Sequence, residues 1–332
     1  MRVRSLGRRG FITVLGAAAL WPFAGHAQQS ERVRRVGVLL PWPEKDPVAQ
    51  ASVKAFARAL NAFGWVEGKN IRIDYRFGAG DPTLYKTFAA ELVGLAPDAI
   101  LADVLPAVAA VQEQTRTIPI VFLFVPDPVG LGLVESLARP GGNITGFSSY
   151  DAELMGKWLQ LLKEIAPGVT RVSVIFNPDT AFASAVIPEI EAAAPSFGMT
   201  VTLAPVHDNA GIEEAVAPLA REPGGGLICL PDSFNTTHRD VIIAAAARSS
   251  LPLIGTIEFP RAGGLMSYWF DTVERHAEAA SYIDRILKGA NPADLPVQQP
   301  TKFPLIINLK TAKALGLAIP EPVLGMADEV IE

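Results

Sequence analysis

Short apolar runs recur along the chain and predict buried β-strands. Each run ends at glycine, proline or a polar residue, as is typical of strands that are covered on both faces. These runs lie at 36–41, 99–104, 118–125, 172–177, 226–231 and 251–256. Two further segments, 71–77 and 200–206, alternate apolar and polar residues, and we expect these strands nearer the edge of a sheet.

Helical patterns separate the predicted strands. The clearest apolar stripes at helical spacing lie at 53–63, 154–165 and 277–287. Gly64 and Gly289 are placed to end the first and third helices, and Asp151 is placed to cap the second. Strand–helix alternation over this length predicts the α/β fold class, with parallel sheets covered by helices on both faces.

Two pairs of segments resemble each other. "RRVGVLLP" (34–41) is similar to "TRVSVIFNP" (170–178), and "RPGGNITGF" (139–147) is similar to "RAGGLMSYW" (261–269). Each pair stands at the start or the end of a unit of four or five strands, which predicts two similar α/β lobes. A chance match of short apolar runs is the alternative. Two lobes joined by crossing strands would suit a hinge that closes on a ligand.

Polar and aromatic residues gather where the predicted strands end. In open parallel sheets, ligands bind outside the carboxyl ends of the strands. The candidate ligand-binding residues at these positions are Trp42, Asp103, Asp127, Asn177, Asp232, Glu258, Tyr268 and Trp269. Such a set can bind a small polar molecule with an apolar or aromatic part, by stacking and a few oriented hydrogen bonds.

Structural roles compete with ligand contact for several of these residues. Asp127 is followed by a proline and fits the N-cap of a predicted helix, a role compatible with ligand contact because a helix N-terminus can present its amides to a carboxylate. A cap is also the alternative for Asp232. Strand alternation can turn Trp269 away from the cleft, and Glu258 and Phe259 can equally pack a loop.

The first residues have the pattern of a secretory signal peptide. Four arginines between residues 2 and 9 precede an apolar stretch at 11–24, and small residues at 25 and 27 suit cleavage before Gln28. "RRGFI" resembles a twin-arginine export signal but lacks the lysine that often follows, so this route and the general one both stay open. Loss of four of the 29 basic residues, against 34 acidic ones, would take the net charge from −5 to −9. We therefore expect an exported, periplasmic protein.

Composition and motifs argue against several other classes. Charged residues make up 19% of the 332 residues without a basic block, which argues against a nucleic-acid surface. Cys229 stands alone in an apolar run, so we expect it to be buried and expect no internal disulfide. Catalytic motifs and zinc spacing do not occur, and His207, His238 and His276 are scattered. We expect no enzyme, metal or cofactor, although a triad assembled from distant residues stays an alternative.

Three long motifs resemble the substrate-binding family of ABC transporters. They are "GWVEGKNIRIDYRF" (64–77), "IPIVF" (118–122) with "DPVGLGLVESLARPGGNITGFS" (127–148), and "RILKGANPADLPVQQPTKFPLIINLKTAKALGL" (285–317). The resemblance extends over 34–332 and is to the branch that includes tryptophan- and tyrosine-type receptors. It implies a type I periplasmic binding protein fold: two Rossmann-like lobes with parallel sheets, a three-segment hinge and a ligand between the lobes.

The resemblance also implies boundaries. After a signal peptide at 1–27, one lobe would comprise 34–146 with about 271–295, and the other 147–270 with about 300–325. The implied partners are a small-molecule ligand, a separate membrane permease and a cytoplasmic ATPase, with no nucleic acid and no cofactor. We expect a monomer.

The ligand is implied only as a class, an aromatic amino acid or related carboxylate. Where relatives continue "MSY" with small residues, this chain has "SYWFD" (267–271), so Trp269 and Phe270 can reshape the pocket. An exported sensor that docks to a membrane receptor and an exported enzyme that uses the same cleft are the alternatives. A DNA-binding regulator is disfavoured because the export signal stands where its helix-turn-helix would be.

Overall fold

The computed structural model describes residues 32–149, 154–179 and 181–332. The predicted signal peptide and the predicted capping residue Asp151 lie outside these ranges. Residues 34–332 form one unit of the chain. Across the described ranges, every helix is too short or too polar to span a bilayer.

Five parallel strands form the first sheet, in the order β2-β1-β3-β4-β5. Their bounds are β1 (Arg34–Leu40), β2 (Ile71–Phe77), β3 (Ala99–Asp103), β4 (Ile120–Val125) and β5 (Ile144–Ser148). The central strand β3 is buried throughout, whereas β2 lies at an edge and is only partly buried. The prediction that the alternating segment 71–77 forms a strand nearer the edge than the continuous apolar runs is thus confirmed in this sheet.

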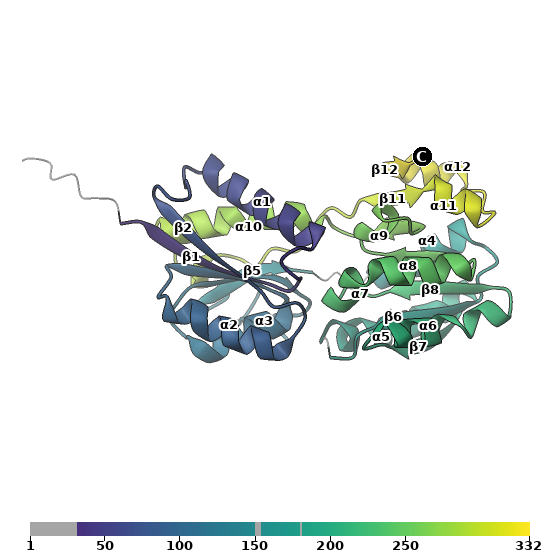
Figure 1. Cartoon of the computed structure of the whole chain (residues 1–332), viewed down its shortest axis with the longest axis horizontal. Coiled ribbons are helices and arrows are strands. Elements are labelled where there is room, and N and C mark those ends of the chain that lie inside the picture. The colour runs from purple at the N-terminus through teal and green to yellow at the C-terminus, as the bar shows by residue number, and fades with distance from the viewer. Residues whose placement is uncertain (1–31, 150–153, 180) are drawn as a thin grey trace, which may run out of the picture. The chain divides into compact units, whose positions relative to one another are not determined.

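Helices cover both faces of the first sheet (Figure 1). α1 (Pro47–Ala62) packs with α10 (Thr272–Leu287) on one face, and α2 (Pro82–Gly94) packs with α3 (Val104–Gln114) on the other. Gly64 and Gly289 have positive φ just beyond α1 and α10, as predicted for residues that end helices.

The second sheet has seven strands in the order β12-β11-β10-β9-β8-β6-β7. Their bounds are β6 (Arg171–Phe176), β7 (Thr200–Pro205), β8 (Gly225–Cys229), β9 (Leu253–Gly255), β10 (Met266–Tyr268), β11 (Leu305–Asn308) and β12 (Glu329–Ile331). Among the described strand pairs of this sheet, only β10–β11 is antiparallel. β7 lies at an edge, and Cys229 is fully buried; both predictions are confirmed.

Helices also cover both faces of the second sheet. α4 (Leu154–Ile165) and α5 (Ala181–Ala193) lie on one face, and α6 (Asn209–Val216) and α8 (Arg239–Arg248) lie on the other. The remaining helices are short: α7 (Ser233–Thr237), α9 (Glu258–Arg261), α11 (Leu309–Ala314), α12 (Glu321–Met326) and the 3-10 turns at 194–197, 219–221 and 292–294.

The sequence similarity between the two halves reflects a structural repeat. The order β7-β6-β8-β9-β10 reproduces β2-β1-β3-β4-β5, with the similar segments forming β1 and β6 at the start and β5 and β10 at the end. The first glycine of each pair also has a positive φ, +82° at Gly141 and +108° at Gly263. The two-sheet α/β prediction is therefore confirmed, and chance similarity does not explain the pattern.

The chain passes between the two sheets three times. It leaves the first sheet after β5, returns before α10, which packs on α1, and leaves again between the 3-10 turn at 292–294 and β11. Three passages agree with the three-segment hinge that the resemblance implies. The lobe boundaries remain a prediction, and β12 extends the second sheet past the expected limit near residue 325.

The segment after β4 differs from the prediction. Residues 126–143 are all described and none is helical, so the predicted helix after Asp127 is wrong. The exposed Asp127 side chain instead accepts a hydrogen bond from the Gly130 amide at 2.9 Å and closes a turn. Gly130 and Gly132, the latter at φ +67°, disfavour a helix here by about 1 kcal/mol each.

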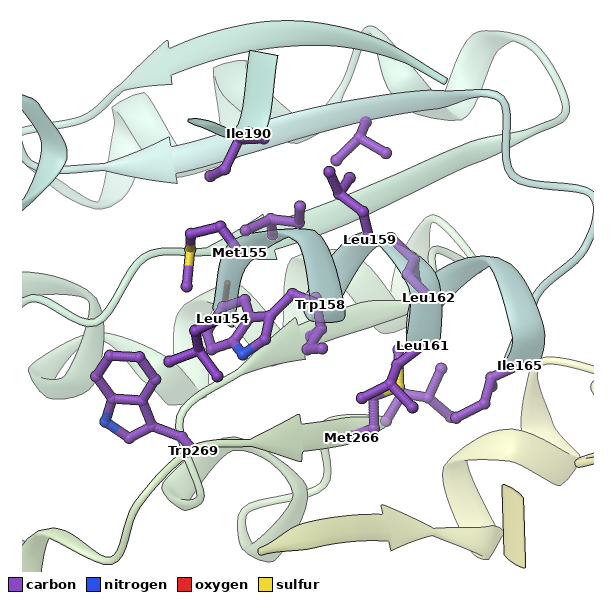
Figure 2. Packing of buried hydrophobic residues seen from close by; sticks show 14 of the residues in the cluster. Leu154, Met155, Trp158, Leu159, Leu161, Leu162, Ile165, Ile190, Met266 and Trp269 are labelled. Atoms are coloured by element: carbon purple, nitrogen blue, oxygen red, sulfur yellow. The ribbon is translucent and has the colours of Figure 1, made fainter. Parts of the chain in front are cut away.

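The core beneath α4 fixes the end of β10 (Figure 2). Trp158 is fully buried and its indole N–H donates to the carbonyl of Tyr268 at 2.6 Å. The ring of Trp269 packs edge-on against Trp158 with a centroid distance of 5.8 Å. This packing sets the direction in which the chain leaves the second sheet.

Candidate ligand-binding cavity

A cavity of about 390 Å³ lies where strands of both sheets end. Its lining includes the residues that follow β1, β6, β8, β9 and β10, together with the first residues of several helices. This is the carboxyl-end position at which open parallel sheets bind ligands. The volume is that of a small-molecule site.

The first-sheet side of the cavity is apolar. We use this name for the lining residues that precede α4: Pro41, Trp42, Ala79, Gly80, Pro82, Tyr85, Val104, Leu105, Pro106, Phe124, Pro126 and Ser149. Among these described residues there is no acid, lysine, arginine or histidine. Burial raises the pKa of the Tyr85 phenol far above its ordinary value, so it stays neutral.

Strained backbone positions shape this side. Ala79, Val104 and Phe124 have φ of +50°, +59° and +59°, although side chains rarely adopt this region. Such positions cost about 1–3 kcal/mol each and are typical of functional sites. A register shift between Leu123 and Val125 marks a bulge, and the Phe124 ring stacks on Phe270 at 5.6 Å with an interplanar angle of 5°.

A buried ion pair lies behind the apolar side. Asp103 and His276 are 0% and 1% exposed, and Oδ2 of the aspartate lies 2.8 Å from Nε2 of the histidine. Histidine Nδ1 lies 2.8 Å from the Thr272 carbonyl, so the imidazolium form can donate from both nitrogens. Burial lowers the pKa of His276, but the charge and hydrogen bond of Asp103 and the carbonyl of Thr272 outweigh this and raise it.

The histidine of this pair supports the cavity wall. Its ring packs against Trp42 at 5.9 Å and against Phe124 at 5.6 Å, and both of those residues line the cavity. Asp103 is enclosed behind them and does not line the cavity. The pair therefore positions aromatic side chains rather than facing a ligand itself.

The second-sheet side carries the ionisable groups. We use this name for the lining residues from Asn177 to Trp269: Asn177, Asp179, Pro231, Asp232, Ser233, Phe234, Thr236, Thr237, His238, Thr256, Glu258 and Trp269. Phe270 and Thr272 also line the cavity, where the chain returns to α10 on the first sheet. Three of them are acids, and threonine and serine hydroxyls are frequent. This side offers charge and hydrogen bonds that the first-sheet side lacks.

Asp232 joins two loops of this side. Its Oδ1 accepts from the Asn235 amide at 2.7 Å, which caps α7, and its Oδ2 accepts from the Asn177 amide at 3.0 Å. Burial raises the pKa of Asp232 to about 7, although hydrogen bonds from three backbone N–H groups act in the opposite direction. The predicted capping role is confirmed, and the same residue lines the cavity.

Glu258 begins α9 and is half-buried at the cavity. Burial raises the pKa of its carboxyl, while hydrogen bonds with Thr256, its own backbone N–H and Thr272 act to lower it. Both threonines also line the cavity. The carboxyl group thus lies at the cavity beside two threonines.

The structure brings five of the eight candidate residues to the cavity: Trp42, Asn177, Asp232, Glu258 and Trp269. The other three lie elsewhere. Asp103 pairs with His276, Asp127 closes an exposed turn, and the Tyr268 ring packs against Phe303 at 5.8 Å. Direct contact between the five lining residues and a ligand stays a prediction.

Sequence reasoning missed several lining residues. Phe124 is aimed by a bulge that no pattern signals, and Tyr85 reaches the cavity from inside α2. The segment "FGAG" (77–80), which was not among the candidates, contributes Ala79 and Gly80. Its position directly after a strand was the available signal.

Two repeated α/β sheets with a cavity at their strand ends define a ligand-binding protein of the periplasmic binding protein type. Comparison with known proteins supports this class. A conserved domain protein of Vibrio cholerae has 31% identity and a TM-score of 0.83, covering 90% of this chain and 100% of that one. An ABC domain of Streptococcus pneumoniae in complex with L-Trp has 26% identity and a TM-score of 0.82, covering 90% and 99%.

Sequence comparison identifies the family. The family described as ABC transporter substrate binding protein matches residues 40–331, so the chain belongs to this family. A tyrosine-binding protein of Clostridioides difficile (strain R20291) is 26% identical over 292 residues, which cover 87% of this chain and 82% of the relative. The resemblance on which the expectations rested is thereby confirmed.

Proposed function

We propose that this chain is the exported, periplasmic receptor of an ABC importer. It binds a small aromatic molecule in the cavity, and it delivers that molecule to a separate membrane permease driven by a cytoplasmic ATPase. The observation that carries the proposal is the cavity itself, because aromatic rings from both sides and acids and hydroxyls of the second-sheet side converge on one small-molecule volume.

An ion pair supports closure of two lobes on the ligand. Arg239 Nη1 lies 3.2 Å from Asp46 Oδ2, and the two side chains are only 13% and 8% exposed. Asp46 caps α1 on the first sheet, whereas Arg239 begins α8 on the second and also donates to the carbonyl of Thr236 at 2.6 Å. An ion pair between the lobes that forms only when they close stabilises the closed form over the open one.

An aromatic ligand is favoured by the lining and by the names of relatives. Six lining residues are aromatic: Trp42, Tyr85, Phe124, Phe234, Trp269 and Phe270. The Clostridioides difficile relative is a tyrosine-binding protein, and the Streptococcus pneumoniae domain was solved in complex with L-Trp. We therefore place the ligand among aromatic amino acids and related aromatic compounds.

A thermal-shift screen tests the proposal. The panel comprises aromatic amino acids, aromatic amines and aromatic carboxylates. A ligand at about 100 times its dissociation constant stabilises the folded protein by roughly 2.7 kcal/mol, a clear shift in melting temperature. A saturable hit recovered chemically unchanged supports a receptor. A hit that is converted during incubation would show an enzyme instead.

A further inference from the structure

Arg275 is a buried cation near the cavity, but it is not one of the described residues that line it. Its side chain is only 8% exposed, although arginine is rarely buried unless it is paired. Nη1 lies 2.6 Å from a carboxylate oxygen of Glu278, whose side chain is 44% exposed. Nε has no hydrogen-bond partner among the described residues. A buried cation that is only partly paired is costly, so its other contacts must help to stabilise it.

Two aromatic rings supply such contacts. The guanidinium carbon of Arg275 lies over the Phe147 ring, 5.2 Å from its centre, and over the Phe270 ring, 5.7 Å from its centre. Both rings are only 3% exposed, so these cation–π contacts are made away from water, where they are strongest. Nη2 also donates to the Ser148 carbonyl at 3.3 Å. Arg275 therefore contacts two separate parts of the chain at once.

These two parts belong to different passages of the chain between the sheets. Phe147 and Ser148 end β5, where the first passage begins, and Phe270 stands in the second passage, between β10 and α10. The third passage is bonded to the first, because the Ser148 amide donates to the Gln298 carbonyl at 2.8 Å. Arg275 thus lies where the three passages meet. Segments of this kind absorb the backbone changes when lobes open and close.

Phe270 connects this cluster to the cavity. Its ring lines the cavity and stacks on the Phe124 ring, another lining residue, at 5.6 Å with an interplanar angle of 5°. Arg275 is followed in α10 by His276, whose ring packs against Phe124. Consecutive residues of α10 therefore support both of the stacked rings.

We propose that Arg275 is a positioning residue for ligand binding. Its guanidinium holds the first and second passages together through the rings of Phe147 and Phe270, and it fixes the Phe270 ring at the cavity. Contact between a ligand and Phe270 is thereby coupled to the arrangement of the passages. This coupling rests on the proposed receptor function, whereas the link between the passages does not.

Hydrogen–deuterium exchange of the ligand-free protein tests the link between the passages. Arg275→Met removes the cation but keeps a long apolar side chain, and Glu278 is exposed enough to be solvated after losing its partner. We expect amide exchange to rise about fivefold in the peptides that contain Ser148 and Gln298. Unchanged exchange in these peptides would refute the link.

Arg248→Met is the matched control for this measurement. Arg248 also pairs with one glutamate, Glu213, but its side chain is 58% exposed and it lies on α8 of the second sheet. It should leave exchange in the same peptides unchanged. Circular dichroism checks that both variants fold, and Arg275→Gln replaces Arg275→Met if the latter does not.

Calorimetric titration tests the effect on the cavity. L-tryptophan and L-tyrosine are titrated into the parent, Arg275→Met, Phe270→Leu and the double variant. We expect Arg275→Met to weaken binding about fivefold, with a urea midpoint close to that of the parent, because loss of a buried ion pair to apolar packing is often neutral. The double variant should bind no more weakly than Phe270→Leu alone, because Arg275 acts through that ring. Arg275→Lys keeps the charge and should recover part of the affinity.

Each outcome of the titration decides a different point. Unchanged affinity in folded Arg275→Met would overturn the positioning role. A loss in the double variant equal to the product of the two single losses would contradict action through Phe270. If neither compound binds the parent, the proposed aromatic amino-acid ligand is contradicted, and the exchange measurement still confirms or refutes the link between the passages.

Discussion

The two sides of the cavity have opposite chemistry although they come from halves of one repeat. The first-sheet side presents rings, prolines and small side chains, with no charged group among its described residues. The second-sheet side presents three acids and most of the hydroxyls. One side is suited to pack an apolar ring, and the other is suited to orient a polar group.

Asp103 and Glu258 show how this difference arises. Asp103 is the last residue of β3, and Glu258 begins α9 shortly after β9. Asp103 is enclosed and paired with His276, so its charge is compensated behind Trp42 and Phe124. Glu258 lines the cavity, and burial raises the pKa of its carboxyl. An acid at the end of a strand can therefore either support the cavity wall or face the ligand, depending on its partner.

Breaking the buried pair should have the largest effect. His276→Ala leaves the Asp103 carboxylate buried without its partner, and we expect a loss of about 3–5 kcal/mol in the free energy of unfolding. Urea denaturation measures it. The double variant with Asp103→Ala should lose clearly less than the sum of the two single changes. Additive losses would show that the two residues do not act as a pair.

The pH dependence of stability should reveal the raised pKa of Asp232. Because its pKa is raised from 3.8 to about 7 in the folded protein, the folded state holds a proton that the unfolded state releases. Its contribution is fully present below about pH 4 and is lost as the pH rises through 7, at about 1.4 kcal/mol per unit.

Asp232→Asn provides the comparison, because asparagine caps helices about as well and does not titrate. Between pH 5 and pH 8, the parent should lose roughly 2.6 kcal/mol more of its unfolding free energy than the variant. His276 acts in the same direction in both proteins and cancels. Parallel pH profiles would contradict the raised pKa.

Removing a ring from the apolar side should weaken binding. Trp42→Ala should lower ligand affinity at least tenfold, about 1.4 kcal/mol, because a buried stacking surface is lost. Tyr268→Ala is the matched control, since that ring packs on Phe303 rather than lining the cavity, and its affinity should stay within about twofold. Equal losses of ligand affinity in the two variants would contradict the assignment of Trp42, but not Tyr268, to the cavity lining.

The smallest expected effect concerns closure. Arg239→Gln and Asp46→Asn each remove one partner of the ion pair, while asparagine preserves the cap of α1. We expect each to weaken ligand binding severalfold, equivalent to about 0.5–1 kcal/mol, with little further loss in the double variant. Titration calorimetry measures all four proteins. Unchanged affinity would show that the pair does not bias closure.

The fold was predictable because hydrophobic patterning reports burial directly. Continuous apolar runs became the buried strands, and the alternating segments 71–77 and 200–206 became the edge strands β2 and β7. The helix predicted after Asp127 does not form. The hydrogen bond from the Gly130 amide to Asp127 closes a turn instead, and Gly130 and Gly132 disfavour a helix.

The site was predictable only in part, because side-chain direction depends on backbone details that patterns do not encode. Trp269 was a candidate that strand alternation could have turned away, and it lines the cavity while its ring packs against Trp158. Phe124 reaches the cavity through a bulge at positive φ. Asp103 stands at a strand end, as a ligand-binding residue would. Its partner His276 is 173 residues away in the sequence, so no local pattern indicates the pair.

A crystal structure with the tightest-binding compound of the panel tests most directly whether the two sides of the cavity contact different parts of the ligand. The account predicts that the aromatic ring of the ligand lies against Trp42 and Phe124, and that its polar group lies within hydrogen-bond distance of Glu258. A ligand with its polar group against the first-sheet side, or one bound outside this cavity, would contradict it.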